Sequence, residues 1–132
     1  MKILKIKRYK VSGAPPEELE DVQLTTDQGI VGDRYNDITF LTTHAKDFRD
    51  RCGSDEQGAC FPYFRENVLI EHSKPLKEVK AIQVGTAEVE LLGNLKECIP
   101  ECIYLGNCAF YQGISYGIVK KSGEINLKSC SF

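Results

Sequence analysis

Short runs of alternating apolar and polar residues recur along the chain, and each run has the length of a β-strand. In residues 2–11 the apolar positions Ile3, Ile6 and Tyr9 are separated mainly by basic side chains. Alternation with a period of two predicts a strand with one buried face, and the many charges favour a place at the edge of a sheet. We therefore expect the chain to begin with a half-exposed edge strand.

Similar runs predict further strands at residues 22–25, 37–42, 68–70, 81–85, 87–92, 113–119 and 123–127. The last two are expected to form a hairpin, because residues 121–123 between them favour a turn. One short helix is predicted from His44 to Arg51 with Thr43 as its cap, and His44 is expected to be solvated. Closely spaced strands with few helices predict a mostly β fold, a closed or partly closed barrel or sandwich, in a single domain of residues 1–132.

The composition of the chain says more about which partners it can bind than about its fold. The chain has 132 residues, with 17 basic and 19 acidic side chains and a formal net charge of −2. This balance lacks the positive footprint of a nucleic-acid-binding protein, so we expect no nucleic-acid partner. No apolar run reaches the length of a signal peptide or a membrane span, which predicts a cytoplasmic protein without membrane contact. The six cysteines are then expected to be reduced thiols.

Three of the cysteines, Cys98, Cys102 and Cys108, gather in residues 96–108. Thiolates attack electrophiles, carry sulfur as persulfides and bind soft metals, so this segment is the first candidate for chemistry. Pro100 favours a helix start, which would place Cys102 at the positive end of a helix dipole and make it reactive. Two other interpretations remain open. Cysteines often only fill space in a core, and the spacing C-x3-C-x5-C, although not that of a zinc ribbon, could hold structural zinc.

Two polar segments, one in a glycine-containing turn and one just before a predicted strand, supply candidate binding residues. The first segment indicates a tight turn, and its pattern alone favours an ordinary surface ion pair between neighbouring acidic and basic side chains. The second segment fits either a solvated loop or the wall of a site. The candidates are Gly32, Asp33, Arg34, Arg65, Glu66 and Asn67.

The order of these motifs resembles that of a stand-alone MOSC domain, the family named for the C-terminal domain of molybdenum cofactor sulfurase. The resemblance implies a β-barrel of the pyruvate-kinase-barrel type and a role in molybdenum-cofactor or sulfur handling. The similar segments cover most of the chain in the same order: residues 29–34, 38–41, 64–68, 82–90, 96–98 with Cys102 and Cys108, 113–119 and 122–125.

The resemblance also implies which cysteines act. Cys98 matches the proposed sulfur carrier or metal ligand best, with Cys102 as the second catalytic candidate and Cys108 as a further metal ligand. The implied function is to bind the molybdenum cofactor (molybdopterin), or to take persulfide sulfur on a cysteine for delivery to a metal–sulfur or molybdenum centre. A cysteine desulfurase and a molybdoenzyme acceptor are the implied partners. Pyridoxal phosphate is associated with the family through a separate desulfurase domain, and we expect none to bind this chain.

The arginines have two open interpretations under this resemblance. Arg34 and Arg65 would bind the phosphate of the cofactor, because a guanidinium group makes charged bidentate contacts, and Asn67 would contact the pterin edge. Alternatively, both arginines form structural salt bridges with Asp33 or Glu66.

Two departures from the family pattern and two alternative functions complete the expectations. Residues 34–36 and Ile99 stand where many relatives have histidine, which favours sulfur transfer or passive cofactor binding over oxidoreduction. One alternative is a non-catalytic metal- or ligand-binding module with structural cysteines. The other is the molybdenum-binding component of a reductase of N-hydroxylated bases, which would need electrons from a partner.

Overall fold

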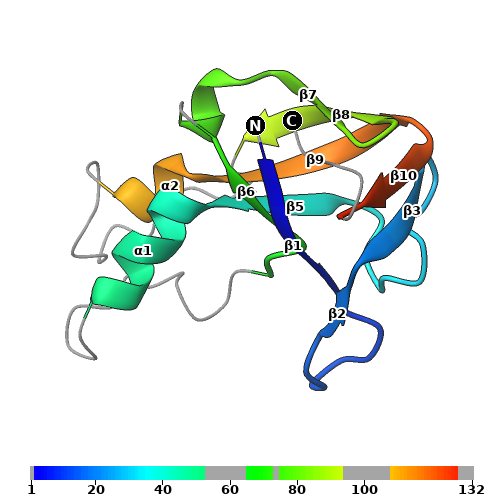
Figure 1. The fold of residues 1–132 in the computed structure, drawn as a ribbon, viewed down its shortest axis with the longest axis horizontal. Coiled ribbons are helices and arrows are strands. Elements are labelled where there is room, and N and C mark those ends of the chain that lie inside the picture. The colour runs from blue at the N-terminus through cyan, green and yellow to red at the C-terminus, as the bar shows by residue number, and fades with distance from the viewer. Residues whose placement is uncertain (1, 53–64, 73–74, 94–107, 128–132) are drawn as a thin grey trace.

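A computed structural model describes residues 2–52, 65–72, 75–93 and 108–127 of the chain (Figure 1). In this part, ten strands form two sheets. The seven-stranded sheet contains, in spatial order, β2 (Glu17–Leu19), β1 (Lys2–Arg8), β6 (Val68–Glu71), β5 (Ile38–Thr42), β9 (Ile114–Lys121), β8 (Ala87–Gly93) and β7 (Ala81–Val84). The three-stranded sheet contains β10 (Gly123–Asn126), β3 (Asp21–Thr25) and β4 (Gly29–Ile30). The helices are α1 (Thr43–Arg51), α2 (Ala109–Gln112) and the 3-10 helix η3 (Leu76–Glu78).

The larger sheet curls into a half-barrel. Neighbouring strands are antiparallel throughout the described part of the chain, except that β5 and β6 run parallel. The α-helices lie together at one end of the molecule, and β3 and β10 lie at the opposite end (Figure 1). The prediction of a mostly β fold with a few short helices is therefore confirmed.

Two apolar clusters stabilise this arrangement, and β5 contributes to both. Ile38 and Phe40 belong to the main cluster, which also includes Val22 and Leu24 of β3. Leu41 belongs to a second cluster beneath α1 and α2. All five residues of β5 are buried, because both faces of this strand are covered. This explains why its sequence is a continuous run of β-branched and apolar residues rather than an alternation.

The charges of the first strand predicted a place at the edge of the sheet, and this prediction is wrong. The short acidic strand β2 pairs with β1 and occupies that edge. Glu17 forms an ion pair with Arg8 at 2.7 Å and lies 3.8 Å from Lys10, while Glu18 lies 3.1 Å from Lys5. Complementary charge therefore brings together two segments that would otherwise both be exposed edges, although each exposed pair contributes little energy by itself.

The predicted hairpin of the last two strands is also wrong. β9 pairs with β5 and β8, whereas β10 pairs with β3 in the other sheet. The chain changes sheets at Gly123, which approaches the backbone of β8 so closely that a Cβ there would lie 2.5 Å from the Ala87 nitrogen. Alternation shows which face of a strand is buried but not which strand is its neighbour. The predicted burial of Ile125 is achieved beside Val22 of β3 instead of beside β9.

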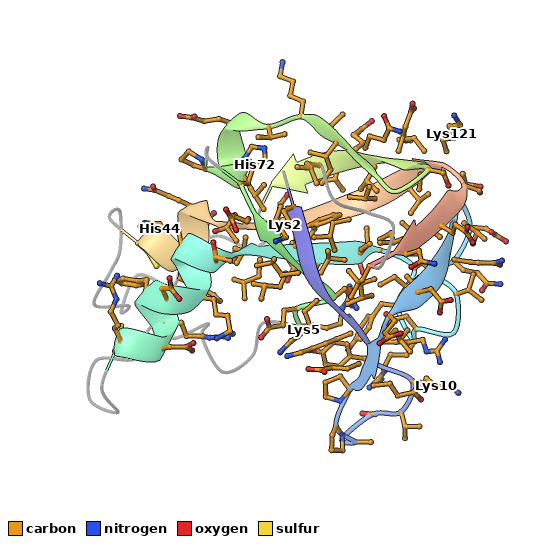
Figure 2. The ribbon with its side chains drawn as sticks, in the orientation of Figure 1. Lys2, Lys5, Lys10, His44, His72 and Lys121 are labelled. Carbon is orange, nitrogen blue, oxygen red and sulfur yellow. The ribbon has the colours of Figure 1, made fainter. Side chains whose placement is uncertain are left out.

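The predicted helix at residues 44–51 is confirmed with a shift of its cap by one residue. The Thr42 hydroxyl accepts a hydrogen bond from the Ala45 N–H at 3.2 Å, so Thr42 rather than Thr43 is the N-cap. His44 is exposed on this helix, as expected (Figure 2). The second predicted helix, near Pro100, lies outside the described residues. Among the helices that the structure describes, none has the length and hydrophobicity needed to cross a membrane.

Candidate functional site

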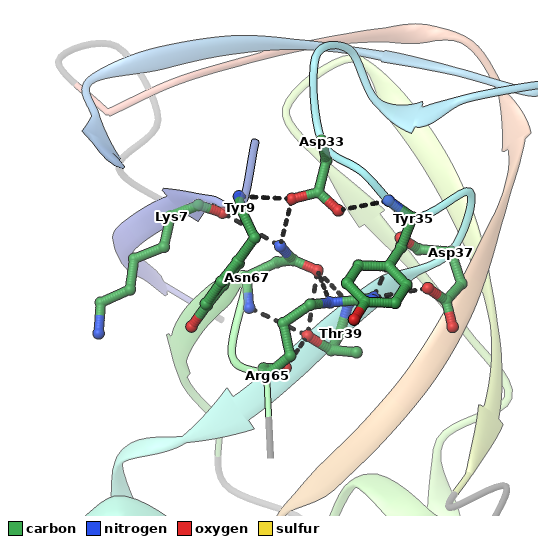
Figure 3. A network of polar contacts seen from close by, with 8 residues as sticks. All are labelled: Lys7, Tyr9, Asp33, Tyr35, Asp37, Thr39, Arg65 and Asn67. Atoms are coloured by element: carbon green, nitrogen blue, oxygen red, sulfur yellow. Dashed lines mark hydrogen bonds and ion pairs between the residues drawn. The ribbon is translucent and has the colours of Figure 1, made fainter. Parts of the chain in front are cut away.

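The two polar segments that the sequence singled out lie against each other in the structure. The turn after β4 carries Asp33 and Tyr35, and the segment leading into β6 carries Arg65 and Asn67 (Figure 3). The Asp33 carboxylate lies 3.4 Å from the Asn67 amide nitrogen, and the Arg65 guanidinium carbon lies 3.9 Å from the centre of the Tyr35 ring. Residues about thirty positions apart in the sequence thus form one polar network.

Asn67 is the centre of this network. Its side-chain nitrogen donates to the Lys7 carbonyl at 3.1 Å and to Asp33, and its side-chain oxygen accepts from the Thr39 N–H at 3.0 Å and from Arg65 Nε at 3.2 Å. The residue is 1% exposed. An amide offers two donors and two acceptor sites, so this arrangement uses its full capacity. Asn67 therefore joins β1, β5 and the turn, and leaves no group to contact a ligand.

The Thr39 hydroxyl completes the connection between β5 and the segment before β6. It accepts a hydrogen bond from the Asn67 N–H at 3.0 Å and donates to the Arg65 carbonyl. Thr39 is fully buried, yet its polar atoms all have partners within the network. The sequence indicated only a β-branched strand residue here, and nothing in the local pattern distinguishes this threonine from one that merely fills the core.

Asp33 fixes the shape of the turn and does not form the surface ion pair with Arg34 that the pattern favoured. Its carboxylate accepts the Tyr9 N–H at 2.7 Å and the Tyr35 N–H at 3.2 Å. The Arg34 N–H donates to the Tyr9 carbonyl at 2.9 Å, which attaches the turn to the end of β1. Hydrogen bonds from backbone N–H groups to an ionised carboxylate are stronger than neutral ones, so Asp33 joins the end of β1 to its own turn.

Gly32 gives the turn its direction. Its φ angle is +89°, a left-handed conformation that side chains other than glycine adopt only with strain. A Cβ at this position would also lie 3.2 Å from the Arg8 side chain, so the backbone lies directly on Arg8. Gly32 therefore sets the position of the residues that follow it in the turn, and contributes no side-chain group to the site.

Arg65 is held by acceptors other than the two expected ones. Its Nη2 atom lies 2.5 Å from the Asp37 carboxylate and 3.3 Å from the Asp37 carbonyl, and not against Asp33 or Glu66. With Nε on Asn67, these contacts leave the Nη1 atom without a hydrogen-bond partner in the described part of the chain. The guanidinium plane is thus fixed by the fold while one of its nitrogens remains available.

Arg34 and Tyr35 are the exposed members of the group. The Arg34 guanidinium makes no hydrogen bond or ion pair with any described residue, and lies 5.1 Å from the centre of the Tyr35 ring. The residue Tyr35 is 42% exposed. Two cations therefore flank one accessible aromatic ring. We call these three residues, Arg34, Tyr35 and Arg65, the Arg–Tyr–Arg surface.

Glu66 forms its ion pairs with cations other than Arg34 and Arg65. Its Oε1 atom lies 3.1 Å from Arg49 and 3.7 Å from Lys7, and all three side chains are largely buried. The Tyr9 hydroxyl donates to the Glu66 carbonyl at 3.3 Å. Burial raises the pKa of the Tyr9 phenol, because the charged phenolate would lose its hydration. The Arg49 guanidinium also lies 5.8 Å from the Phe110 ring, which connects this pair to α2.

The cysteine segment can be placed only at its end. Cys108 is the N-cap of α2, where its Sγ accepts the Tyr111 N–H at 3.4 Å, and it is 5% exposed within the second apolar cluster. Cys98 and Cys102 lie outside the described residues. Among the residues that are described, no three His, Cys, Asp or Glu side chains are grouped so that they could hold a metal ion.

Comparison with known proteins gives a fold and no family. No family model and no curated protein matches the chain. A crystal structure described as that of a hypothetical protein superposes with a TM-score of 0.57 at 14% sequence identity. The superposition covers 95% of this chain and 64% of that one, so this chain spans slightly less than two thirds of the other's length. At this identity the likeness concerns the fold alone.

Proposed function

We propose that this chain is a MOSC-like domain that binds the molybdenum cofactor (molybdopterin) at the Arg–Tyr–Arg surface. It would also take persulfide sulfur on Cys98 or Cys102 for delivery to a molybdenum or metal–sulfur centre. The observation that carries the proposal is the convergence of the two family-like polar segments into one surface. This surface presents two guanidinium groups and an accessible ring.

The available groups fit an anionic, ring-bearing ligand. Arg34 has no acceptor in the described part of the chain, and Arg65 has one nitrogen to spare, so both can donate charged hydrogen bonds to a phosphate. Tyr35 is partly exposed, and the part of its ring that the two guanidinium groups leave uncovered offers an apolar contact to a flat heterocycle. When bound, the cofactor would supply the molybdenum centre that accepts sulfur. Asn67 and Asp33 act earlier, since before any ligand arrives Asn67 binds the Arg65 side chain and Asp33 fixes the turn that carries Arg34.

The sulfur step needs only thiol chemistry. The thiolate of Cys98 would attack the outer sulfur of a persulfide on a partner desulfurase. One S–S bond forms at Cys98 as the S–S bond of the donor breaks, and the donor cysteine leaves as a thiolate. No external oxidant or reductant is required, because the sulfur is transferred at a constant oxidation state.

The cofactor proposal can be tested with a fluorescent pterin in phosphorylated and dephosphorylated forms. The substitution Arg34→Gln should weaken binding of the phosphorylated form by about tenfold, as expected for loss of one charged hydrogen bond. Binding of the dephosphorylated form should change little. Arg51→Gln removes an equally exposed arginine from α1 and serves as the control. Equal affinities of the wild type and Arg34→Gln for the phosphorylated form would refute the assignment.

The sulfur proposal can be tested by intact mass after incubation with a cysteine desulfurase and cysteine. The wild type should gain one sulfur atom that a reductant removes, and Cys98→Ser or Cys102→Ser should abolish the gain. Cys52→Ser is the matched control, because this thiol donates to the Phe48 carbonyl at the end of α1. Sulfur loading that survives in both cysteine variants would contradict the carrier role. Stoichiometric zinc instead of persulfide would support the alternative of a structural metal module.

A further inference from the structure

The strand β7 leaves one edge of the seven-stranded sheet open. Among the described strands its only neighbour is β8, and it lies at the upper rim of the molecule in Figure 1. The Leu91 N–H donates to the Lys80 carbonyl at 2.7 Å, which makes these two residues a hydrogen-bonded pair. Hydrogen-bonded and non-hydrogen-bonded pairs alternate along an antiparallel ladder, so Ile82 also bonds to β8. The backbone N–H and C=O groups of Ala81 and Gln83 therefore point to the free edge.

The sequence of β7 carries none of the features that usually protect an open edge. Such edges are blunted by charged side chains, proline or a bulge. β7 reads Ala-Ile-Gln-Val, it pairs with β8 without a register shift, and Ala81 and Gln83 are exposed. The opposite edge of the same sheet is β2, which carries Glu17 and Glu18. One edge of the sheet is thus protected by charge, and the other is not.

Apolar surface accompanies these backbone groups. Ile82 packs against the main apolar cluster but is only half-buried, whereas its cross-strand partner Val89 is 1% exposed. A further strand beside β7 would cover the rest of the Ile82 side chain. The edge therefore offers both hydrogen-bonding groups and apolar area to an added strand.

We propose that β7 pairs in antiparallel orientation with β7 of a second copy of this chain. The two-fold axis would pass between the two Ile82 residues, which face each other as a non-hydrogen-bonded pair. Ala81 of each copy would then lie opposite Gln83 of the other copy. Each such pair exchanges two backbone hydrogen bonds, so that all the backbone groups on the free edge of both residues are used. The interface is isologous, as in most homodimers.

The register explains why a second copy fits this edge. A shift by two residues in one direction would place Gln83 opposite Val79, whose N–H already donates to the Leu76 carbonyl at 3.0 Å. A shift in the other direction would place Ala81 opposite Gly85, whose carbonyl already accepts the Gln83 side chain at 3.3 Å. The central register alone uses free groups on both sides. A symmetric pair of β2 strands, in contrast, would bring glutamates of both copies together.

This interface is independent of the proposed function. β7 lies three strands away from β5 in the sheet, and no residue of the Arg–Tyr–Arg surface belongs to β7, β8 or β9. Two four-residue strands form an interface smaller than the roughly 1,200–2,000 Å2 of a stable complex. We therefore expect a weak dimer, with a dissociation constant of about 100 μM.

Concentration-dependent hydrogen exchange tests the pairing directly. Sedimentation of the intact chain with reductant present, between about 10 μM and 1 mM, should show a monomer–dimer equilibrium. Over the same range, the Ala81 and Gln83 amides should exchange about fourfold more slowly at the high concentration, because the monomer fraction falls by that factor. The Ile82 amide should be protected at both concentrations, since it bonds to β8.

Substitutions at the edge separate this interface from any other. Gln83→Pro removes an N–H that β8 does not use, so the fold should persist while the dimer weakens about tenfold or more. Gln83→Lys adds a charge at the edge without altering the backbone, and should weaken the dimer about threefold or more. Gln28→Lys, an exposed glutamine in the turn between β3 and β4, is the matched control and should have no effect. Ile118→Lys alters an exposed apolar residue of β9 away from the edge, and should also have no effect.

Three results would overturn the proposal. The chain could sediment as a monomer up to about 1 mM, well above the expected dissociation constant. The Ala81 and Gln83 amides could exchange at the same rate at both concentrations although a dimer forms. Gln83→Lys could dimerise like the wild type while Ile118→Lys does not, which would assign the association to the outer face of the sheet.

Discussion

The substitution Asn67→Ala should destabilise the protein strongly, because the buried Asn67 side chain joins β1, β5 and the turn after β4. Its removal leaves the Thr39 N–H and the Lys7 carbonyl without their partners, and takes one donor from Asp33 and one acceptor from Arg65. Each buried group left unsatisfied costs about 1–3 kcal/mol. Water can enter the space and recover part of this loss. We therefore expect the free energy of unfolding to fall by about 3 kcal/mol, a large part of the roughly 5–15 kcal/mol typical of a domain.

Urea denaturation followed by circular dichroism measures this change. For a slope of about 1.5 kcal/mol per molar, a loss of about 3 kcal/mol lowers the midpoint by about 2 M. Asn36→Ala is the matched control, since Asn36 is an exposed amide in the same turn and should change the stability by no more than about 0.5 kcal/mol. A loss below about 1 kcal/mol for Asn67→Ala, similar to the control, would refute a central structural role for this residue.

Three further predictions concern single groups. The ammonium of Lys46 lowers the pKa of the Asp50 carboxyl by a hydrogen bond of 2.6 Å, so Lys46→Gln should raise that pKa in a 13C NMR titration. Because the pKa of Asp50 is lowered in the folded state, its stabilising contribution is present at neutral pH and is lost as the pH falls through that pKa. The wild type should thus lose its advantage over Lys46→Gln in acid. Gly85→Ala should lower the melting temperature far more than Gly13→Ala, since both glycines have positive φ but only at Gly85 would a Cβ overlap a β10 carbonyl. Tyr9→Phe should remove the phenol with a raised pKa from an ultraviolet pH titration, and an unchanged alkaline limb would contradict the burial of that hydroxyl.

Strands with one buried face were predictable because alternation is a local property. β3 and β8 show this alternation directly, because buried and exposed residues alternate over most of their lengths. The partner of a strand is not local, and this is why the pairing of β10 with β3 was missed. The acidic strand β2 was missed for a related reason, since its strand conformation depends on the basic residues of β1.

The candidate site was predictable as a set of residues but not as an arrangement. The sequence identified Asp33, Arg34, Arg65 and Asn67, and the structure brings the two segments together. It did not indicate that Tyr35 would lie beside both guanidinium groups, because that contact depends on how the turn after β4 meets the segment before β6. Which residues hold the network and which remain available to a ligand emerges only from the hydrogen bonds.

The most direct test of the proposed function is the content of the protein itself. The wild type should be purified without reductant from a host that makes the molybdenum cofactor, and its molybdenum, pterin and sulfane sulfur measured per chain. The proposal predicts molybdenum and pterin in equal amounts, both reduced in Arg34→Gln and unchanged in Arg51→Gln. Protein that carries neither the cofactor nor sulfane sulfur, even when the host is rich in both, would contradict it.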